Sequence, residues 1–166
     1  MIAQQAAFEY ILIMVETGLD DIKAHVRAGD FETAHSHAIA LAEKHQHDSR
    51  AQLAAAIACD RLGLEAEAAP FYEIARQLGV PQEDRKLLVV GYASTLRNLG
   101  RAEESIHLLT EALEDDPDDT ALQAFLALAL HSAGHKDSAL AIMLKAALQG
   151  ARENAFAPFA RALNEY

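Results

Sequence analysis

Histidines are the residues of this chain whose chemistry first suggests a site. The chain has eight of them in 166 residues, and two pairs, His35 with His37 and His45 with His47, are spaced two apart. Residues two apart on a helix point about 200° around its axis, so His35 and His37 cannot both face one ion. A zinc site needs ligands three or four residues apart together with a third ligand. We therefore expect no metal site and interpret the histidines as solvated or turn residues. A metal-binding or enzymatic accessory protein that acts through its histidines stays a distant alternative.

No motif for catalysis stands out elsewhere in the sequence. A catalytic site needs a nucleophile or a metal, an oriented base and shelter from water. The chain has no glycine-rich phosphate loop, paired-carboxylate motif or Ser/His/Asp signature. The acidic stretch 114–119 lacks the central glycine of a calcium loop, and Asp119 or Thr120 is expected to cap the next helix. The single Cys59 is interpreted as a small buried hydrophobe. We predict a protein that is not an enzyme and has no cofactor.

The formal net charge of −11 narrows the classes of partner. Nucleic-acid backbones and anionic membranes attract clustered Lys and Arg, so neither is expected as a partner. No Lys or Arg precedes Lys23, and the apolar run 10–15 is too short for a signal segment or a membrane span. One free thiol is compatible with a reducing compartment. We expect a cytoplasmic protein that is not embedded in a membrane.

Four glycines indicate the elements that must position these residues. They follow one another at spacings of 34, 37 and 34 residues and are Gly29, Gly63, Gly100 and Gly134. A period near 34 is the signature of a two-helix repeat, and glycine accepts the left-handed conformation that ends a helix. Alanine and leucine, both strong helix formers, dominate the composition. The sequence therefore predicts an all-α fold with one glycine between the two helices of each repeat.

The glycines and the helical spacing of apolar residues give the expected helix bounds. The first helices of the repeats are expected at 18–28, 49–62, 83–99 and 120–133, and the second helices at 31–45, 65–78, 102–114 and 136–149. Further helices are expected at 3–16 and 152–164. The three extra residues between Gly63 and Gly100 fall around 79–84. They either lengthen the following helix by about one turn or form a longer loop.

The residues around the glycines resemble the tetratricopeptide repeat (TPR) family. Seven residues before each glycine, where that family favours a small side chain, stand Ile22, Ala56, Ala93 and Ala127. The proline that closes a TPR unit is kept at Pro117 and shifted to Pro81, whereas Asp21 and His25 stand at positions that are apolar in the family. Segments 94–101 and 125–131 also resemble small bacterial TPR-only proteins, a group without an established activity.

This resemblance implies a right-handed TPR-type solenoid of about four helix-turn-helix repeats. The whole chain, 1–166, is then one TPR domain. Its repeats lie at approximately 15–48, 49–85, 86–119 and 120–150, with an N-terminal helix at 1–14 and a C-terminal capping helix at 151–166.

In the TPR proteins that this chain resembles, one face of the first helices lines a concave groove. The matching positions here mix apolar side chains with a polar rim, which suits a peptide carrying apolar anchors and a carboxylate. They are Arg50, Leu53, Ile57, Arg61, Val90, Gly91, Ser94, Arg97, Asn98, Phe125 and His131. Gly91 leaves room either for a ligand side chain or for a neighbouring helix. The asparagines with which chaperone-binding TPR domains begin their carboxylate clamp are replaced by Lys23, Ile57, Ser94 and Leu128.

We interpret the chain as a non-enzymatic interaction module that binds a protein or peptide segment on its concave face. The alternative is a self-associating scaffold, because the run 10–15 is apolar on all sides and one helix pair cannot bury every side of it. Tyr10, Ile11, Ile13 and Met14 would then form the interface of a two-fold homodimer. Docking of the same helix within its own monomer is the other outcome left open.

Overall fold

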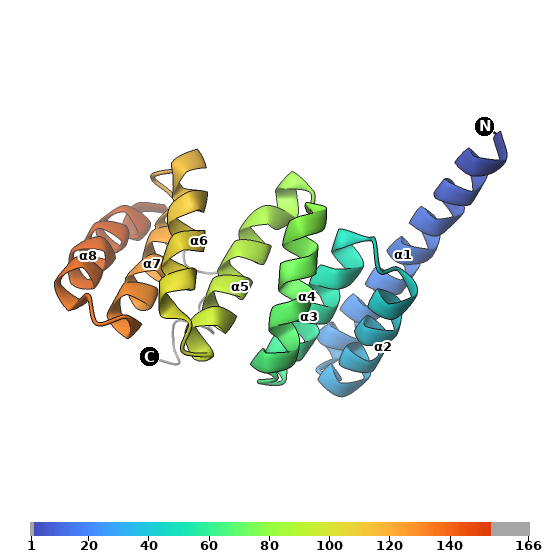
Figure 1. The fold of residues 1–166 in the computed structure, drawn as a ribbon, viewed down its shortest axis with the longest axis horizontal. Helices are drawn as coiled ribbons and strands as arrows, with labels where there is room; N and C mark the ends of the chain where they lie inside the picture. The colour runs from blue at the N-terminus through green and yellow to red at the C-terminus, as the bar shows by residue number, and fades with distance from the viewer. Residues whose placement is uncertain (1, 154–166) are drawn as a thin grey trace. The chain divides into compact units, whose positions relative to one another are not determined.

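The structure is a computed structural model that describes residues 2–153, with the side chains of residues 14–149. All the regular elements in this part of the chain are helical (Figure 1). They are α1 (Ile2–Ala28), α2 (Phe31–Lys44), α3 (Ser49–Arg61), α4 (Glu65–Leu78), the 3₁₀ turn η1 (Gln82–Asp84), α5 (Arg85–Asn98), α6 (Ala102–Asp115), α7 (Thr120–Ser132) and α8 (Lys136–Glu153). The all-α prediction is confirmed. The first residues of the expected capping helix, up to Glu153, belong to α8, and the rest of it, from residue 154 onward, lies outside the described residues.

The helices form consecutive pairs that belong to two compact units. Unit 1, Met1–Asp84, contains α1 to α4, and unit 2, Arg85–Tyr166, contains α5 to α8. In unit 1, α2 packs against α1 and also against α3, which pairs with α4. In unit 2, α7 packs against α5, α6 and α8. Each unit thus holds two repeats, and within each unit the second helix of the first repeat contacts the first helix of the second repeat.

The repeat glycines end the first helix of every pair. They have φ angles of 77°, 71°, 78° and 91° in chain order, a conformation that glycine adopts without strain. At the first of them, the Asp30 amide donates to the His25 carbonyl at 3.0 Å and the Gly29 amide donates to the Val26 carbonyl at 3.2 Å. This is the paired hydrogen-bond pattern of a Schellman C-cap. The glycine period therefore set the helix ends as expected.

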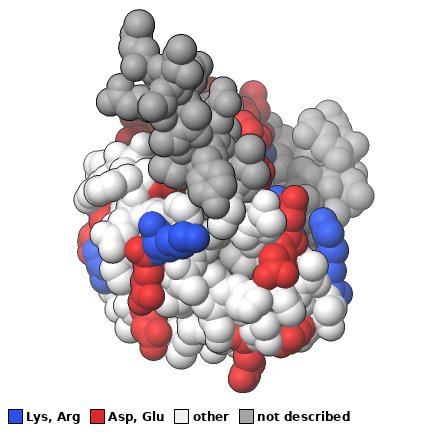
Figure 2. Space-filling model, turned by 90° about the vertical axis from the view of Figure 1, so that its right-hand side faces the viewer, with Lys and Arg blue, Asp and Glu red and all other residues white. Residues whose placement is uncertain are grey.

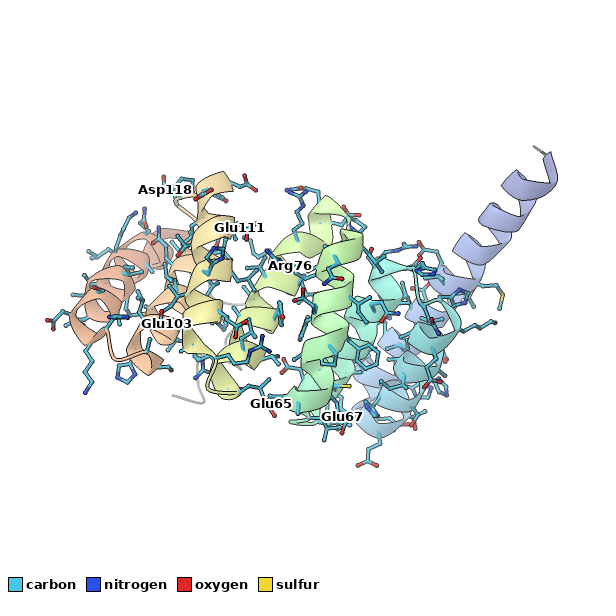
Figure 3. All side chains as sticks on the ribbon, in the orientation of Figure 1. Glu65, Glu67, Arg76, Glu103, Glu111 and Asp118 are labelled. Carbon is cyan, nitrogen blue, oxygen red and sulfur yellow. The ribbon has the colours of Figure 1, made fainter. Side chains whose placement is uncertain are left out.

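The starts of the helices are stabilised by acidic residues. The Asp119 carboxylate, which the sequence offered as a cap, accepts hydrogen bonds from the Ala121 and Leu122 amides at 2.9 and 3.0 Å. Two second helices lack a side-chain cap but carry acidic residues in their first turns, among them Glu65 on α4 and Glu103 on α6 (Figure 3). Negative charge there complements the positive end of the helix dipole.

The first helix is longer than the sequence suggested. Two helices, 3–16 and 18–28, were expected, but α1 is continuous from Ile2 to Ala28 and passes through Gly18. A Cβ atom at Gly18 would lie 2.7 Å from Cδ1 of Leu41 on α2, so the glycine allows the two helices to approach closely. Gly18 thus allows α2 to pack closely against α1, and it does not end α1.

The extra residues of the second spacing form a loop. Gly79 ends α4 with φ 79°, and the single turn η1 precedes α5, which starts at Arg85 and is not lengthened. The division between the two units falls directly after this turn, at Asp84.

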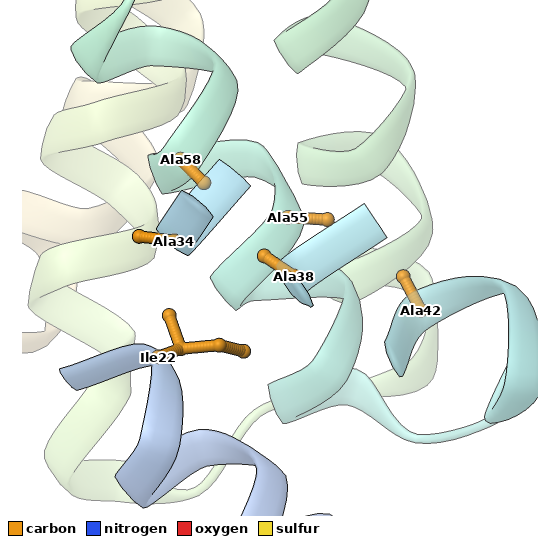
Figure 4. Packing of buried hydrophobic residues seen from close by; sticks show 6 residues of the cluster. All are labelled: Ile22, Ala34, Ala38, Ala42, Ala55 and Ala58. Carbon is orange, nitrogen blue, oxygen red and sulfur yellow. The ribbon is translucent and has the colours of Figure 1, made fainter. Parts of the chain in front are cut away.

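Small side chains make the core. In unit 1, Ile22 of α1 packs with alanines of α2 and α3 (Figure 4). Ala56, Ala93 and Ala127, the small-residue positions of the later repeats, are all buried, as predicted. In unit 2, the Ser105 hydroxyl of α6 donates to the Ala93 carbonyl at 2.8 Å, which is possible only where the two helices lie close together. Alanine at these positions therefore fixes a short distance between paired helices.

Candidate functional site

The expected groove residues lie on the first helices of three repeats, α3, α5 and α7, but their apolar members are largely covered. Leu53, Val90 and Phe125 expose 4%, 5% and 3% of their surface, whereas Ile57 is half-buried. Side chains covered to this extent contribute to the core of their own unit. The surface that these helices present to a partner therefore consists mainly of the polar residues among the expected groove residues.

In unit 1, two arginines of that set already have partners within the chain. Arg50 forms an ion pair with Glu16 of α1, and the hydrogen bond from this pair raises the pKa of the guanidinium. Arg61 places its guanidinium 5.6 Å from the ring centroid of Phe31, the distance of a cation–π contact. Arg61 is solvent-exposed and Arg50 is half-buried. Of the two, Arg61 has more surface to offer to a ligand.

In unit 2, the polar members lie towards the ends of α5 and α7. Arg97 donates from Nη2 to the Asn98 side-chain oxygen at 2.7 Å, and burial lowers the pKa of its guanidinium. Asn98 and His131 are exposed, and Ser94 and Gly91 are half-buried. A basic residue thus stands in the last turn of each of the three helices, as Arg61, Arg97 and His131.

A surface hollow of about 480 Å³ lies elsewhere, in unit 1. It is bounded by the last turn of α2 and the residues that follow it, by one residue of α3 and by the C-terminal half of α4. It includes none of the expected groove residues. Its lining is Ala42, Glu43, Gln46, His47, Gln52, Phe71, Ile74, Gln77 and Leu78. Ile74 and Leu78 are exposed there, so the hollow offers apolar contact to a partner. Its lining residues come from segments far apart in the sequence, and no single motif signals it.

Three of the eight histidines fall into two clusters of metal-ligand side chains. His35 and His37 point to different groups, as their spacing requires: His35 lies with Cys59 and Glu67, and His37 lies with Asp21 and His25. Sequence reasoning missed the second cluster, although Asp21 and His25 have the spacing of four residues that a metal site uses.

Cys59 is fully buried on α3, as expected from its position. Burial, and to a lesser degree the nearby carboxylates of Glu67 and Asp60, raises the pKa of its thiol to about 11. The thiol is therefore protonated at neutral pH, and neither a reactive thiolate nor a strong metal ligand is present at this position.

Charge on the described surface is mixed. Figure 2 shows acidic and basic side chains interspersed with uncharged ones on the face in view, without a basic patch.

A membrane-spanning helix, which would need a long apolar stretch, is not found among the described residues.

Comparison with known proteins gives the family and the fold. A sequence model of the family described as Tetratrico peptide repeat matches residues 49–166, and comparison with curated proteins finds no match. The structure is similar to MamA 41-end from Desulfovibrio magneticus RS-1, with 14% identity, a TM-score of 0.68, and coverage of 91% of this chain and 92% of that one. It is also similar to the MamA RS-1 ArsTM double mutant, with 16% identity, a TM-score of 0.71, and coverage of 84% and 76%.

A third similar structure is YrrB, described as a TPR protein with an unusual peptide-binding site. It has 19% identity and a TM-score of 0.67, and the match covers 89% of this chain and 77% of that one. At such identities the likeness concerns the fold alone. Folds of this kind serve in general as scaffolds for protein–protein interaction. The family model covers most of the chain, and the repeat glycines and helix pairs agree with it: this chain belongs to the tetratricopeptide repeat family.

Proposed function

We propose that the chain is a non-enzymatic interaction module that binds a peptide or protein segment through its first helices, with α3 in unit 1 and α5 and α7 in unit 2 each offering a surface within its own unit. The observation that carries the proposal is the basic residue in the last turn of each of these helices, Arg61, Arg97 and His131. Arg97 and His131 stand three residues before their turn glycines, and Arg61 stands two residues before its own. Donors at the same end of successive first helices suit a chain-like partner that carries carboxylates. The peptide-binding site ascribed to YrrB supports the same class of ligand.

The expected partner is an extended segment with acidic side chains. Because Leu53, Val90 and Phe125 are covered, apolar anchors on that partner contribute less than the sequence suggested, and charge-assisted hydrogen bonds contribute more. Each such hydrogen bond is worth about 1.5–3 kcal/mol. Loss of one rim arginine should therefore weaken binding by at least about tenfold.

Peptide selection followed by charge reversal tests this proposal. Peptides about 15 residues long, which reach about 50 Å when extended, would be selected from a random library on the immobilised full chain. Selected peptides should be acidic, and the double variant Arg61→Glu, Arg97→Glu should bind them at least about tenfold more weakly in fluorescence anisotropy.

Arg76→Glu is the matched control, because Arg76 is exposed and stands in the last turn of α4, a second helix (Figure 3). It should leave the affinity unchanged. Arg76→Glu changes the net charge by half as much as the double variant does. A loss of binding free energy in Arg76→Glu that is half the loss in the double variant would therefore show that only the overall charge matters, and unchanged binding by the double variant would remove these arginines from the site.

Self-association is the second candidate function. Leu140, Leu144 and Leu148 expose 61%, 56% and 74% of their surface on α8, and their spacing of four residues aligns them in one row. An apolar row of this kind suits an identical row on a second copy. The N-terminal interface proposed from the sequence is the other surface. Of its members, Met14 is half-buried in α1, while Tyr10, Ile11 and Ile13 precede the side chains that the structure describes.

Light scattering after gel filtration would decide between these surfaces. A dimer that Leu144→Glu dissociates and Ile13→Glu preserves would assign the interface to α8, and the reverse result would assign it to the N-terminal helix. A monomer of 18.0 kDa at every concentration would refute self-association.

A further inference from the structure

Three side chains of types that commonly bind metal ions lie close together between α1 and α2: Asp21, His25 and His37. His37 Nδ1 of α2 lies 2.6 Å from Asp21 Oδ2 of α1, and His25 Nε2 lies 3.8 Å from Asp21 Oδ1. One ligand atom from each of the three residues lies within 4.8 Å of the other two. The rings of His25 and His37 are 5.0 Å apart and stand nearly perpendicular, at 83°. All three residues are exposed or half-buried, so an ion reaches them from solvent.

These distances fit a tetrahedral ion. Zinc bonds of about 2.0–2.1 Å to nitrogen and oxygen place neighbouring ligand atoms about 3.4 Å apart. The separations in the structure, 2.6 Å from His37 Nδ1 to Asp21 Oδ2 and 3.8 Å from His25 Nε2 to Asp21 Oδ1, lie on either side of that value. They end on the two oxygens of one carboxylate, of which a single oxygen would bind the ion. A zinc ion would replace the proton through which His37 and Asp21 are hydrogen-bonded, and small rotations of these side chains would complete the coordination. Two imidazoles and one carboxylate are ligands that zinc takes together, with water in the remaining position.

A second carboxylate orients one of the histidines. His25 Nδ1 lies 3.3 Å from Asp30 Oδ2. Because an ionised carboxylate only accepts, the proton of His25 belongs on Nδ1, and the lone pair of Nε2 is directed to Asp21 and His37. The Asp30 carboxylate also accepts a hydrogen bond from the Thr33 amide at 3.2 Å, which holds it at the start of α2. A carboxylate that holds a ligating histidine in this way is a regular feature of zinc sites.

The other repeats show that helix packing does not require these residue types. The three positions stand eight and four residues before the turn glycine and eight residues after it. The second repeat has Ala55, Cys59 and Phe71 there, and the third has Tyr92, Leu96 and Leu108. The fourth repeat is also apolar at all three positions. The family match begins at residue 49, after the repeat in which the polar triad stands.

We propose that Asp21, His25 and His37 form a divalent metal site, with Zn²⁺ as the best-fitting ion. The ion joins α1 to α2 in the one repeat where these packing positions are polar. The cluster of His35, Cys59 and Glu67 is a poorer site, because its cysteine is fully buried and an ion does not reach it directly from solvent.

Calorimetric titration of the metal-free full chain with zinc chloride tests the proposal. We expect one ion per chain, and a rise in the melting temperature with zinc that a chelator reverses, because an ion bound only by the native state stabilises it. Asp21→Asn, His25→Gln and His37→Gln should each weaken binding at least about 100-fold, since loss of an outer-shell partner alone costs 10–100-fold. Asp30→Asn keeps a residue that is able to cap α2, and it should weaken zinc binding by about 10–100-fold, as expected for an outer-shell partner.

His107→Gln is the control for adventitious binding to surface histidines, because His107 is exposed on α6 and belongs to neither cluster. It should bind zinc as the unaltered chain does. Far-UV circular dichroism of every variant verifies that the helices are retained, as expected for substitutions of exposed or half-buried residues. The proposal would be overturned if the chain bound no zinc at millimolar concentration, or if His37→Gln bound zinc as tightly as the unaltered chain. It would also be overturned if His37→Gln and His107→Gln lost the same amount of affinity.

Discussion

Replacing Tyr72 with alanine is expected to lower the free energy of unfolding of unit 1 by about 3–5 kcal/mol. Tyr72 is the largest side chain that is fully buried among the described residues, with 1% of its surface exposed. It lies in the middle of α4, which packs against α3. The other buried residues of α4 are all alanines, and so are most of the buried residues of α3, and such short side chains cannot fill the cavity that the substitution would leave.

Urea denaturation followed by circular dichroism measures this loss, and Tyr72→Phe is its matched control. Phenylalanine keeps the ring and removes only the hydroxyl, so it should cost about 0.5–1.5 kcal/mol. Hydrogen exchange should locate the lost protection in α3 and α4, because repeat arrays are stabilised by interactions between neighbouring repeats. A loss below about 1 kcal/mol in Tyr72→Ala would contradict the packing described for α4.

The helix boundaries could be predicted from the sequence because local residues set them. Each turn glycine takes a left-handed conformation that other residues adopt at a cost. Asp119 caps α7 through contacts made within three residues of the chain. Acidic first turns follow from the helix dipole in the same local way. Such signals need no knowledge of the partner helix.

The course of α1 could not be predicted because tertiary contact decided it. A glycine near the expected helix boundary resembles a helix end, but Gly18 lies where Leu41 of α2 approaches, and the helix continues through it. Packing between elements overrides local preference in such cases. As a result, Asp21 and His25 lie on the same helix as the segment 3–16, which the sequence had assigned to a separate helix.

The metal-ligand cluster escaped sequence reasoning for a related reason. His37 attracted attention through His35, its neighbour in sequence, whereas its partners in space are Asp21 and His25 across the turn. Recognising them needs the register between two helices, which the turn at Gly29 fixes. Comparison of repeat positions could have found the cluster, because Asp21 and His25 depart from the apolar residues of the other repeats.

The expected groove was predicted by position on the helix, and position alone does not give exposure. A helical repeat places Leu53, Val90 and Phe125 on one face of their helices, yet each is almost fully covered. Exposure depends on how closely neighbouring helices approach, and alanine-rich contacts bring them close. The exposed polar ends of the same helices are therefore the part of the prediction on which the proposed function rests.

Ala127→Leu is expected to lower the free energy of unfolding of unit 2 by about 1–3 kcal/mol through overpacking. Ala127 exposes 2% of its surface on α7, a helix that packs against α5, α6 and α8. Because α7 has neighbours on three sides, a larger side chain there has to push a whole helix away. The register of the repeat depends on this position, which corresponds to Ala56 and Ala93.

Ala141→Leu on α8 is the control for this change. Ala141 is exposed, and leucine has nearly the same helix propensity as alanine, so the free energy of unfolding should change by less than about 0.5 kcal/mol. Thermal and urea denaturation of the two variants would be compared under the same conditions. A neutral Ala127→Leu would mean that α7 presents a different face to its neighbours, and the repeat register derived from the four glycines would then be wrong for the last repeat.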